Sequence, residues 1–181
     1  MTVKETKLKG CFILEPIVFE DTRGYFFESF NQFTFNELIG QNVNFIQDNE
    51  SFSIKGTLRG LHYQSGKYAQ AKLVRVIKGS VLDIVVDIRK DSATFGEYLS
   101  LELSEHNKHQ LFIPKGFAHG FVVLSDTAIF SYKCDNYYNK ESEGGIIYND
   151  NSLKIDWKLN QEELVISEKD LKLPPFEKAI F

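Results

Sequence analysis

The chain has 181 residues, of which 43% are hydrophobic and 25% charged, and it contains 16 Phe and 8 Tyr. This length is typical of one domain, so we expect residues 1–181 to form a single domain whose core needs neither disulfides nor a structural metal. The net charge of -4 excludes a general nucleic-acid binder, which would carry a basic surplus, and any phosphate binding must therefore be local.

Short apolar bursts separated by turn residues recur along most of the chain. They predict strands over residues 11–14, 25–30, 44–47, 71–77, 80–88, 97–103, 110–113, 120–124 and 128–134. Many short strands at close spacing are typical of a β-sandwich or a β-barrel.

Helical patterns are few. The clearest covers residues 31–39, where Phe33, Phe35 and Leu38 would form one apolar face, and a weaker polar segment lies in the C-terminal region. From Glu141 onward turn residues and polar stretches dominate, so we expect this region to wrap around the sheets rather than to form a second domain.

The N-terminal residues and the cysteines carry no targeting or ligand signal. Residues 1–7 have no apolar core, and no run approaches the ~18 apolar residues expected of a membrane span, which favours a cytoplasmic protein. Cys11 and Cys134 are far apart in the sequence and lack a metal-ligand spacing, so we expect both to be reduced thiols.

Two histidine-centred segments stand out, at residues 59–64 (RGLHYQ) and 114–121 (PKGFAHGF). Each places a histidine beside glycine and aromatic residues in a stretch that otherwise resembles a strand, with basic residues nearby. A histidine titrates near neutral pH, and neighbouring cations attract anions. The pair therefore predicts a site that handles an anionic substrate and moves protons.

The second segment matches the PxGxxH pattern of cupin barrels through Pro114, Gly116 and His119. The first cupin motif would normally contain HxH followed by a glutamate, but His62 is followed by tyrosine and glutamine. Because a transition metal requires about three or four N or O ligands, two histidines with Lys72 nearby disfavour a metal. We predict an all-β, cupin-like jelly-roll barrel with a few short peripheral helices and no metal ion.

Over nearly its whole length the chain resembles the dTDP-4-dehydrorhamnose 3,5-epimerases, metal-free cupin-type enzymes of nucleotide-sugar rhamnose synthesis. The matching segments are residues 21–28, 47–49, 58–64, 72–75, 86–89, 113–121, 132–133, 137–138 and 167–170.

This resemblance implies proton abstraction from C3 and C5 of dTDP-4-dehydro-6-deoxy-D-glucose through enolate intermediates, giving dTDP-4-dehydro-L-rhamnose without a cofactor. It also implies a homodimer in which N-terminal strands are exchanged and both chains contribute to the substrate site.

The resemblance places the catalytic roles on four residues. His62 would be the base, Asp170 its carboxylate partner, Tyr132 the proton donor on the opposite face, and Lys72 the cation that stabilises the enolate oxygen. The structural alternatives are a packed barrel histidine, a buried aromatic residue and a solvated lysine. Asp83, an acid in an apolar strand pattern, lies either near the pocket or serves as a structural acceptor, and we leave it out of the catalytic set.

The resemblance also implies a substrate-binding set: Arg23, Glu28, Gln47, Asp48, Asn49, Arg59, His119, Tyr138, Glu143 and Lys169. The arginine fork suits phosphate oxygens, and amide side chains can read the edge of a pyrimidine. Tyr138 would stack on thymine, with Tyr137 as the alternative because the pair leaves the register open by one residue. An exposed loop ion pair is the alternative for Arg23, as turn capping is for Gln47 and Asn49.

Three other functions compete with the double epimerase. The closest is a mono-epimerase that inverts only C3 or C5 of a related nucleotide-linked 4-keto-6-deoxy sugar. A metal-dependent cupin oxygenase is disfavoured by the missing ligands. A non-catalytic sugar-binding module would not need His62, Lys72, Tyr132 and Asp170 together.

Overall fold

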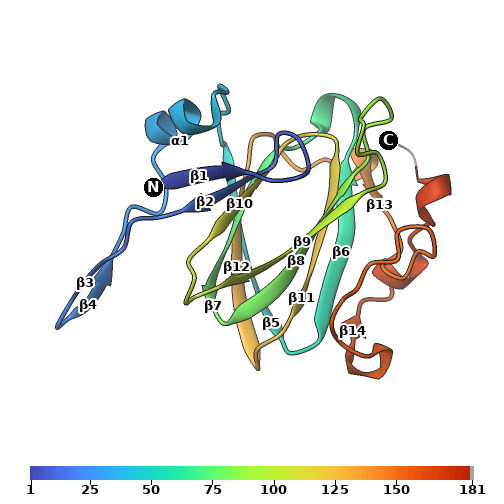
Figure 1. Ribbon diagram of the computed structural model, residues 1–181. Coiled ribbons are helices and arrows are strands. Elements are labelled where there is room, and N and C mark those ends of the chain that lie inside the picture. Colours follow the sequence, from blue (N-terminus) through green and yellow to red (C-terminus); the bar gives the residue numbers. More distant parts are fainter. Residues whose placement is uncertain (180–181) are drawn as a thin grey trace.

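The computed structural model describes residues 1–179 and contains two large β-sheets that face each other (Figure 1). The first sheet has the order β1 (Thr2–Glu5), β2 (Phe12–Glu15), β10 (Gln110–Ile113), β7 (Lys72–Lys78), β12 (Thr127–Cys134) and β5 (Gln47–Ile54). The second has the order β13 (Glu143–Gly145), β6 (Thr57–Gln64), β11 (Phe117–Val123), β8 (Ser80–Asp87) and β9 (Tyr98–Ser104), with β14 (Val165–Ile166) also paired to β6. The predicted all-β, cupin-like jelly roll is confirmed.

The remaining elements are small. Strands β3 (Phe19–Asp21) and β4 (Gly24–Phe26) form a separate hairpin, and α1 (Gln32–Ile39) is an α-helix. The described residues also contain five short 3₁₀ turns: η1 (Gly66–Tyr68), η2 (Lys140–Ser142), η3 (Gln161–Glu163), η4 (Asp170–Lys172) and η5 (Phe176–Lys178). No helix in the described part of the chain is long and apolar enough to cross a membrane.

Strand alternation builds the core between the sheets. Val74 and Val76 of β7, Val81 and Val85 of β8, and Phe130 of β12 belong to one buried cluster, because every second side chain of a strand points to the same face. The barrel interior is therefore apolar along much of its length. Polar side chains that point into this apolar interior are unusual and therefore indicate a structural or functional role.

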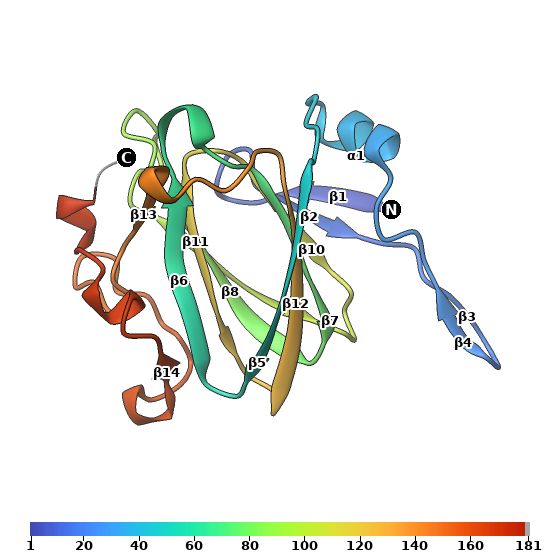
Figure 2. The same ribbon diagram turned by 180° about the vertical axis from the view of Figure 1, so that it is seen from behind.

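The C-terminal region packs on the outer face of the second sheet (Figure 2). Ile146, Leu153 and Trp157 join a second buried cluster with residues of β6, β8 and β11, and the indole of Trp157 donates a hydrogen bond to the Tyr148 carbonyl at 2.8 Å. This arrangement agrees with the expectation that the region wraps around the sheets. It also carries Asp170 back to β6.

Helix α1 forms where the sequence predicts it but buries a different face. Asn31 caps its N-terminus by accepting from the Thr34 N–H, and Gly40 ends it with a left-handed φ of 65°. Phe35 and Ile39, four residues apart, are the buried pair, whereas Phe33 is 77% exposed. The expected face of Phe33, Phe35 and Leu38 was wrong: Phe33 lies only two residues before Phe35 and therefore on another side of the helix, and Leu38 is 39% exposed while Ile39 is buried.

Two strand predictions also need correction. The strand expected over 25–30 ends at Phe26, since residues 27–30 pair with no strand in the described chain. The strand expected over 44–47 instead begins at Gln47 and runs to Ile54. Its inward positions carry polar residues that line a cavity, which conceals the apolar alternation on which the prediction depended.

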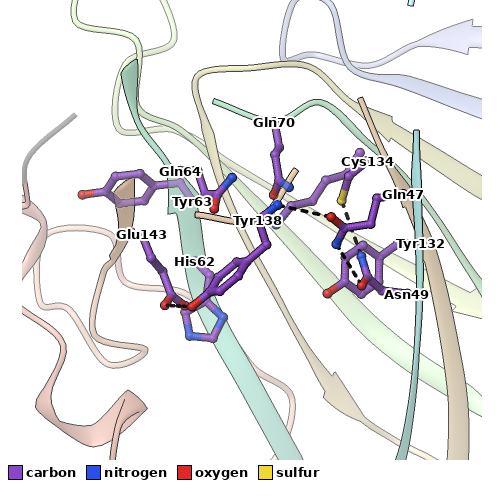
Figure 3. Close-up of a pocket in the computed structure, with 11 residues that line it drawn as sticks. Gln47, Asn49, His62, Tyr63, Gln64, Gln70, Tyr132, Cys134, Tyr138 and Glu143 are labelled. Carbon is purple, nitrogen blue, oxygen red and sulfur yellow. Dashed lines mark hydrogen bonds between the residues drawn. The ribbon is translucent and has the colours of Figure 1, made fainter. Parts of the chain in front are cut away.

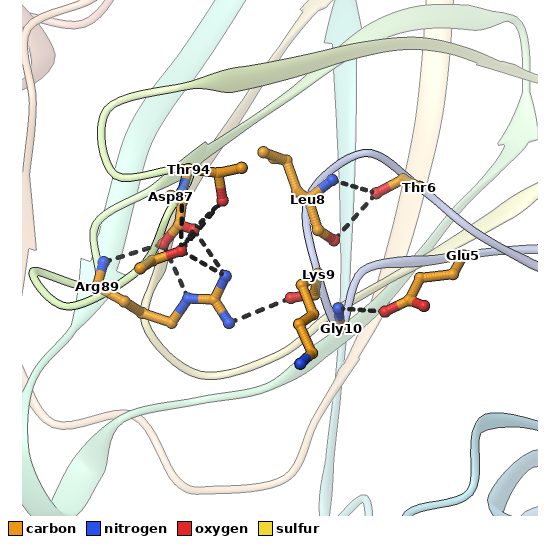
Figure 4. Close-up of polar contacts among 9 residues, drawn as sticks. Glu5, Thr6, Leu8, Lys9, Gly10, Asp87, Arg89 and Thr94 are labelled. Atoms are coloured by element: carbon orange, nitrogen blue, oxygen red, sulfur yellow. Dashed lines mark hydrogen bonds and ion pairs between the residues drawn. The ribbon is translucent and has the colours of Figure 1, made fainter.

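A polar cluster ties the loop between β1 and β2 to the loop after β8 (Figure 4). The buried Asp87 carboxylate accepts hydrogen bonds from the Arg89 guanidinium at 2.8 and 2.7 Å, and from the hydroxyls of Ser92 and Thr94 at 2.6 Å each. Arg89 in turn donates to the Lys9 carbonyl at 3.1 Å. The cluster fixes the N-terminal loop on the barrel.

The β3–β4 hairpin extends away from both sheets (Figures 1 and 2). Phe19, Tyr25 and Phe26 on it are all more than half exposed. Clustered exposed apolar side chains of this size mark an interaction surface.

Candidate active site

Paired strands place the two motif histidines side by side. His62 on β6 pairs with His119 on β11, and Arg59 pairs with Phe121. Between these two pairs β6 contains two residues and β11 only one, which is a β-bulge. The bulge turns both Arg59 and His62 toward the barrel interior, although their spacing of three would otherwise place them on opposite faces.

Two glycines permit this close approach of the strands. A Cβ on Gly60 would lie 2.6 Å from the Gly120 Cα, and one on Gly120 would lie 2.6 Å from the Arg59 carbonyl oxygen. Gly60 also has a φ of +123°, which L side chains rarely adopt. The glycine beside each histidine is thus required by the backbone geometry.

Two adjoining cavities of about 320 Å³ each open at this point. They share His62, Lys72 and Tyr132 in their walls. The glutamine pocket is otherwise lined by Gln47, Asn49, Tyr63, Gln64, Gln70, Cys134, Tyr138 and Glu143 (Figure 3). The dyad pocket is otherwise lined by Glu50, Ser51, Arg59, His119, Gly120, Phe121, Phe130, Ser167, Lys169 and Asp170.

His62 forms a dyad with Asp170, whose Oδ1 lies 2.8 Å from the imidazole Nε2. The other carboxylate oxygen accepts the Gly60 N–H at 3.3 Å, so both oxygens have partners. Burial alone would raise the pKa of Asp170, but the His62 hydrogen bond and charge, helped by the Gly60 N–H and Lys169, lower it overall. The carboxylate therefore stays ionised and orients the imidazole through Nε2. The other ring nitrogen, Nδ1, is left to accept a proton from a substrate in the cavity.

Lys72 and Tyr132 form the wall common to both pockets. Burial lowers the pKa of the Lys72 ammonium, against opposing contributions from Cys134, Asp83 and Glu143. Burial likewise raises the pKa of the Tyr132 phenol, which keeps its proton at neutral pH. A protonated phenol can donate a proton, and a partly desolvated cation stabilises an adjacent oxyanion strongly.

His119 forms a second dyad, with its Nε2 2.9 Å from Oδ2 of Asp83. Both side chains are almost completely enclosed, and Oδ1 of Asp83 has no hydrogen-bond partner among residues 1–179. Burial raises the pKa of Asp83, while His119 and Lys72 oppose that shift. Asp83, for which the sequence allowed either a place near the pocket or a structural role, thus lies behind His119, beside the pocket wall.

Five expected binding residues are linked by hydrogen bonds and an ion pair at the rim of the glutamine pocket. Glu143 accepts the Tyr138 hydroxyl at 3.0 Å and pairs with the Lys169 ammonium at 2.6 Å. The Gln47 amide donates to the Asn49 side-chain oxygen at 3.1 Å. The rim therefore presents an aromatic ring, amide groups and an ion pair within one opening.

The structure does not bring all expected residues to these pockets. Arg23 is on the exposed hairpin and pairs with Asp21 at 2.6 Å, which is the exposed ion pair that the sequence offered as the alternative to substrate binding. Glu28 accepts the Asn31 side chain at 3.2 Å, away from both cavities. Asp48 lies on the outer side of β5 and binds Lys133 at 2.9 Å. In the described chain none of these three residues lines either cavity.

Some cavity residues were not assigned from the sequence. Gln64 was noted only as part of its motif, and Gln70 and Cys134 were not given a role in the site. A signal was present for Gln64, since a residue two positions after His62 on a strand shares its face. Both cysteines are free and buried, and Asn49 donates to the Cys134 sulfur at 3.7 Å.

The assembled groups suit proton transfer on an anionic substrate. A carboxylate-backed imidazole, a protonated phenol and a buried ammonium surround one space, with Arg59 donating to Ser53 at 3.1 Å at its edge. Within residues 1–179 no group of three or more His, Cys, Asp and Glu side chains is arranged to hold a metal ion.

Comparisons with known proteins agree with this chemistry. The family model for dTDP-4-dehydrorhamnose 3,5-epimerase matches residues 5–178. The chain is 53% identical over 180 residues to the dTDP-4-dehydrorhamnose 3,5-epimerase of Salmonella typhimurium, covering 99% of this chain and 98% of the relative.

Two solved structures have the same fold. One, of dTDP-4-dehydrorhamnose 3,5-epimerase from Elizabethkingia anophelis, is 56% identical with a TM-score of 0.94, covering 98% of this chain and 97% of that one. The other, a 3,5-epimerase from Legionella pneumophila in complex with dTDP-4-keto-L-rhamnose, is 47% identical with a TM-score of 0.94, covering 98% of this chain and 93% of that one.

Proposed function

The chain belongs to the dTDP-4-dehydrorhamnose 3,5-epimerase family, and we propose that it inverts C3 and C5 of dTDP-4-dehydro-6-deoxy-D-glucose to give dTDP-4-dehydro-L-rhamnose. It is an isomerase whose substrate is a dTDP-linked 4-keto sugar. We also propose a cytoplasmic location.

The proposed reaction is two rounds of deprotonation and reprotonation. The 4-keto group makes the hydrogens on C3 and C5 acidic, because the carbanion formed by losing either one is delocalised as an enolate. His62 removes the proton and becomes imidazolium, held by Asp170. Lys72 stabilises the enolate oxygen, and Tyr132 delivers a proton to the opposite face of the same carbon. The His62 imidazolium then loses its proton to water, and the Tyr132 phenolate regains one from water.

The observation that carries this proposal is the wall shared by the two pockets. His62, Lys72 and Tyr132 line both cavities, so base, cation and donor surround the same volume. Gln47, Asn49, Arg59, His119, Tyr138, Glu143 and Lys169 line one cavity or the other, which supports their proposed role in binding substrate.

A homodimer would supply the residues that one chain leaves outside. We propose that the β3–β4 hairpin, with Phe19, Tyr25 and Phe26 exposed, docks on a second copy and brings Arg23 and Glu28 to the partner's pocket. Arginine on such an arm suits the diphosphate of the nucleotide.

Complementation between chains tests the dimer. Mixing His62→Ala chains with Arg23→Ala chains should create dimers in which one pocket holds both intact residues, so activity should rise above that of either variant alone. A monomer in solution, or mixed chains no more active than their average, would contradict the shared site.

The function is tested by NMR of the purified protein with dTDP-4-dehydro-6-deoxyglucose in D₂O, with the product trapped by a reductase. Deuterium should enter at both C3 and C5, and the trapped product should have the L-rhamno configuration. Exchange at one carbon only would indicate a mono-epimerase. No exchange, with the nucleotide sugar still bound, would indicate a binding module.

A further inference from the structure

We propose that Gln64 is a positioning residue that selects Tyr138, rather than its neighbour Tyr137, as the aromatic ring facing the glutamine pocket. The proposal rests on the proposed function, because it assigns that ring to binding the nucleoside of the substrate. Gln64 is nearly buried and projects from β6 on the same side as His62.

The Gln64 amide holds the backbone on both sides of Tyr138. Its Oε1 accepts the Asn139 N–H at 2.6 Å, and its Nε2 donates to the Tyr137 carbonyl at 3.2 Å. A second donation, to the Tyr68 carbonyl at 2.8 Å, uses its remaining N–H. Both amide protons and the oxygen are therefore engaged.

This pattern fixes the loop to within one residue. A primary amide that binds the C=O of one residue and the N–H of the residue two positions later behaves like the backbone of a neighbouring strand. Such pairing sets which side chain of the segment points to which side. Here Tyr138 lines the glutamine pocket (Figure 3), whereas Tyr137 lines neither cavity.

The other contacts of Tyr138 depend on the same register. Its N–H donates to Gln47 Oε1 at 3.2 Å, and its hydroxyl donates to Glu143 at 3.0 Å. A shift of the loop by one residue would break both bonds and offer Tyr137 in place of Tyr138. Gln64 therefore makes strand β6 the common support of the base and of the nucleoside-binding ring.

Steady-state kinetics of Gln64→Met test the proposal. We expect KM to rise about tenfold, equal to about 1.4 kcal/mol, while kcat changes less than twofold, because the proton-transfer groups are untouched. Gln32→Met is the matched control: it removes another glutamine that donates to a loop carbonyl, that of Val43, outside both pockets. It should leave KM and kcat unchanged.

A double-mutant cycle shows whether Gln64 acts through Tyr138. Tyr138→Ala should raise KM by itself, and adding Gln64→Met to it should raise KM less than twofold further. A full tenfold rise in that background, or an unchanged KM in the single variant, would overturn the proposal. Absence of deuterium exchange in the unmodified protein would instead overturn the proposed function.

Gln64→Glu keeps the proposal testable if Gln64→Met does not fold. The carboxylate keeps the size of the side chain and can still accept the Asn139 N–H, but it cannot donate to the two carbonyls. It should fold and should raise KM with kcat preserved. An unchanged KM would again overturn the proposal.

Discussion

The two histidine–carboxylate dyads differ in access although they lie on paired strands. The His62 side chain is 29% exposed and its partner Asp170 comes from the C-terminal region, whereas His119 is 8% exposed and its partner Asp83 is fully buried on the adjacent strand β8. The bond lengths, 2.8 and 2.9 Å, are nearly equal. Access to the cavity, not the length of the hydrogen bond, therefore distinguishes the proposed base His62 from the more enclosed His119.

Carboxylate satisfaction separates the dyads further. Both oxygens of Asp170 accept hydrogen bonds, while one oxygen of Asp83 accepts none from the described part of the chain. A saturated carboxylate is held ionised, as the lowered pKa of Asp170 indicates, whereas burial raises the pKa of Asp83. The His62 dyad is therefore the one prepared to accept and stabilise a proton.

Among the substitutions that test this comparison, replacing the proposed base should reduce activity most. His62→Ala should lower deuterium exchange at C3 and C5 by about 10³-fold or more, because general-base catalysis contributes roughly 10²–10⁴-fold and both inversions use the same imidazole. Nucleotide binding, measured by calorimetry with dTDP, should remain. Loss of binding together with exchange would instead point to a folding role.

The sequence predicted the local features of this site better than the contacts between segments that are distant along the chain. Local patterns and the family resemblance identified His62, Lys72 and Tyr132, which share one wall. Pattern alone could not pair His62 with Asp170, since 108 residues separate them and only packing of the C-terminal region joins them. The inward polar residues of β5 hid a strand for a functional reason, because they line the cavity.

Removing the phenol should have a smaller effect. Tyr132→Phe keeps the ring beside Lys72 but removes the proton donor of both rounds, so deuterium entry with inversion should fall by roughly 10²-fold at C3 and at C5. NMR that resolves the C3 and C5 positions measures both rates in one sample. Equal retention of both exchanges would remove Tyr132 from the mechanism.

The enclosed dyad should tolerate the loss of its charge better. Asp83→Asn still offers an oxygen to His119, so we expect exchange to fall less than tenfold. Asp170→Asn is the matched substitution on the other dyad and should cost about 10²-fold or more, since the imidazolium loses its counter-charge. If Asp83→Asn costs as much as Asp170→Asn, access does not distinguish the dyads.

Asp87 is a buried carboxylate that lines neither pocket, so its replacement should change stability and not catalysis. Burial by itself would raise the pKa of Asp87, but hydrogen bonds from Arg89, Ser92 and Thr94 lower it to about 2, from the ordinary value of 3.8. A folded-state pKa below the unfolded one gives stability that is present above the unfolded value and is lost as pH falls through the folded value.

Asp87→Asn should therefore reduce the free energy of unfolding while leaving exchange at C3 and C5 unchanged. The reduction should be roughly 2 kcal/mol at pH 7 and about half of that near pH 3, since each unit of pKa shift corresponds to about 1.4 kcal/mol. Urea denaturation at the two pH values measures it, with the exposed neighbour Asp91→Asn as the control. A reduction that does not change with pH would mean that the cluster stabilises the loop by shape and neutral hydrogen bonds rather than by the charge of Asp87.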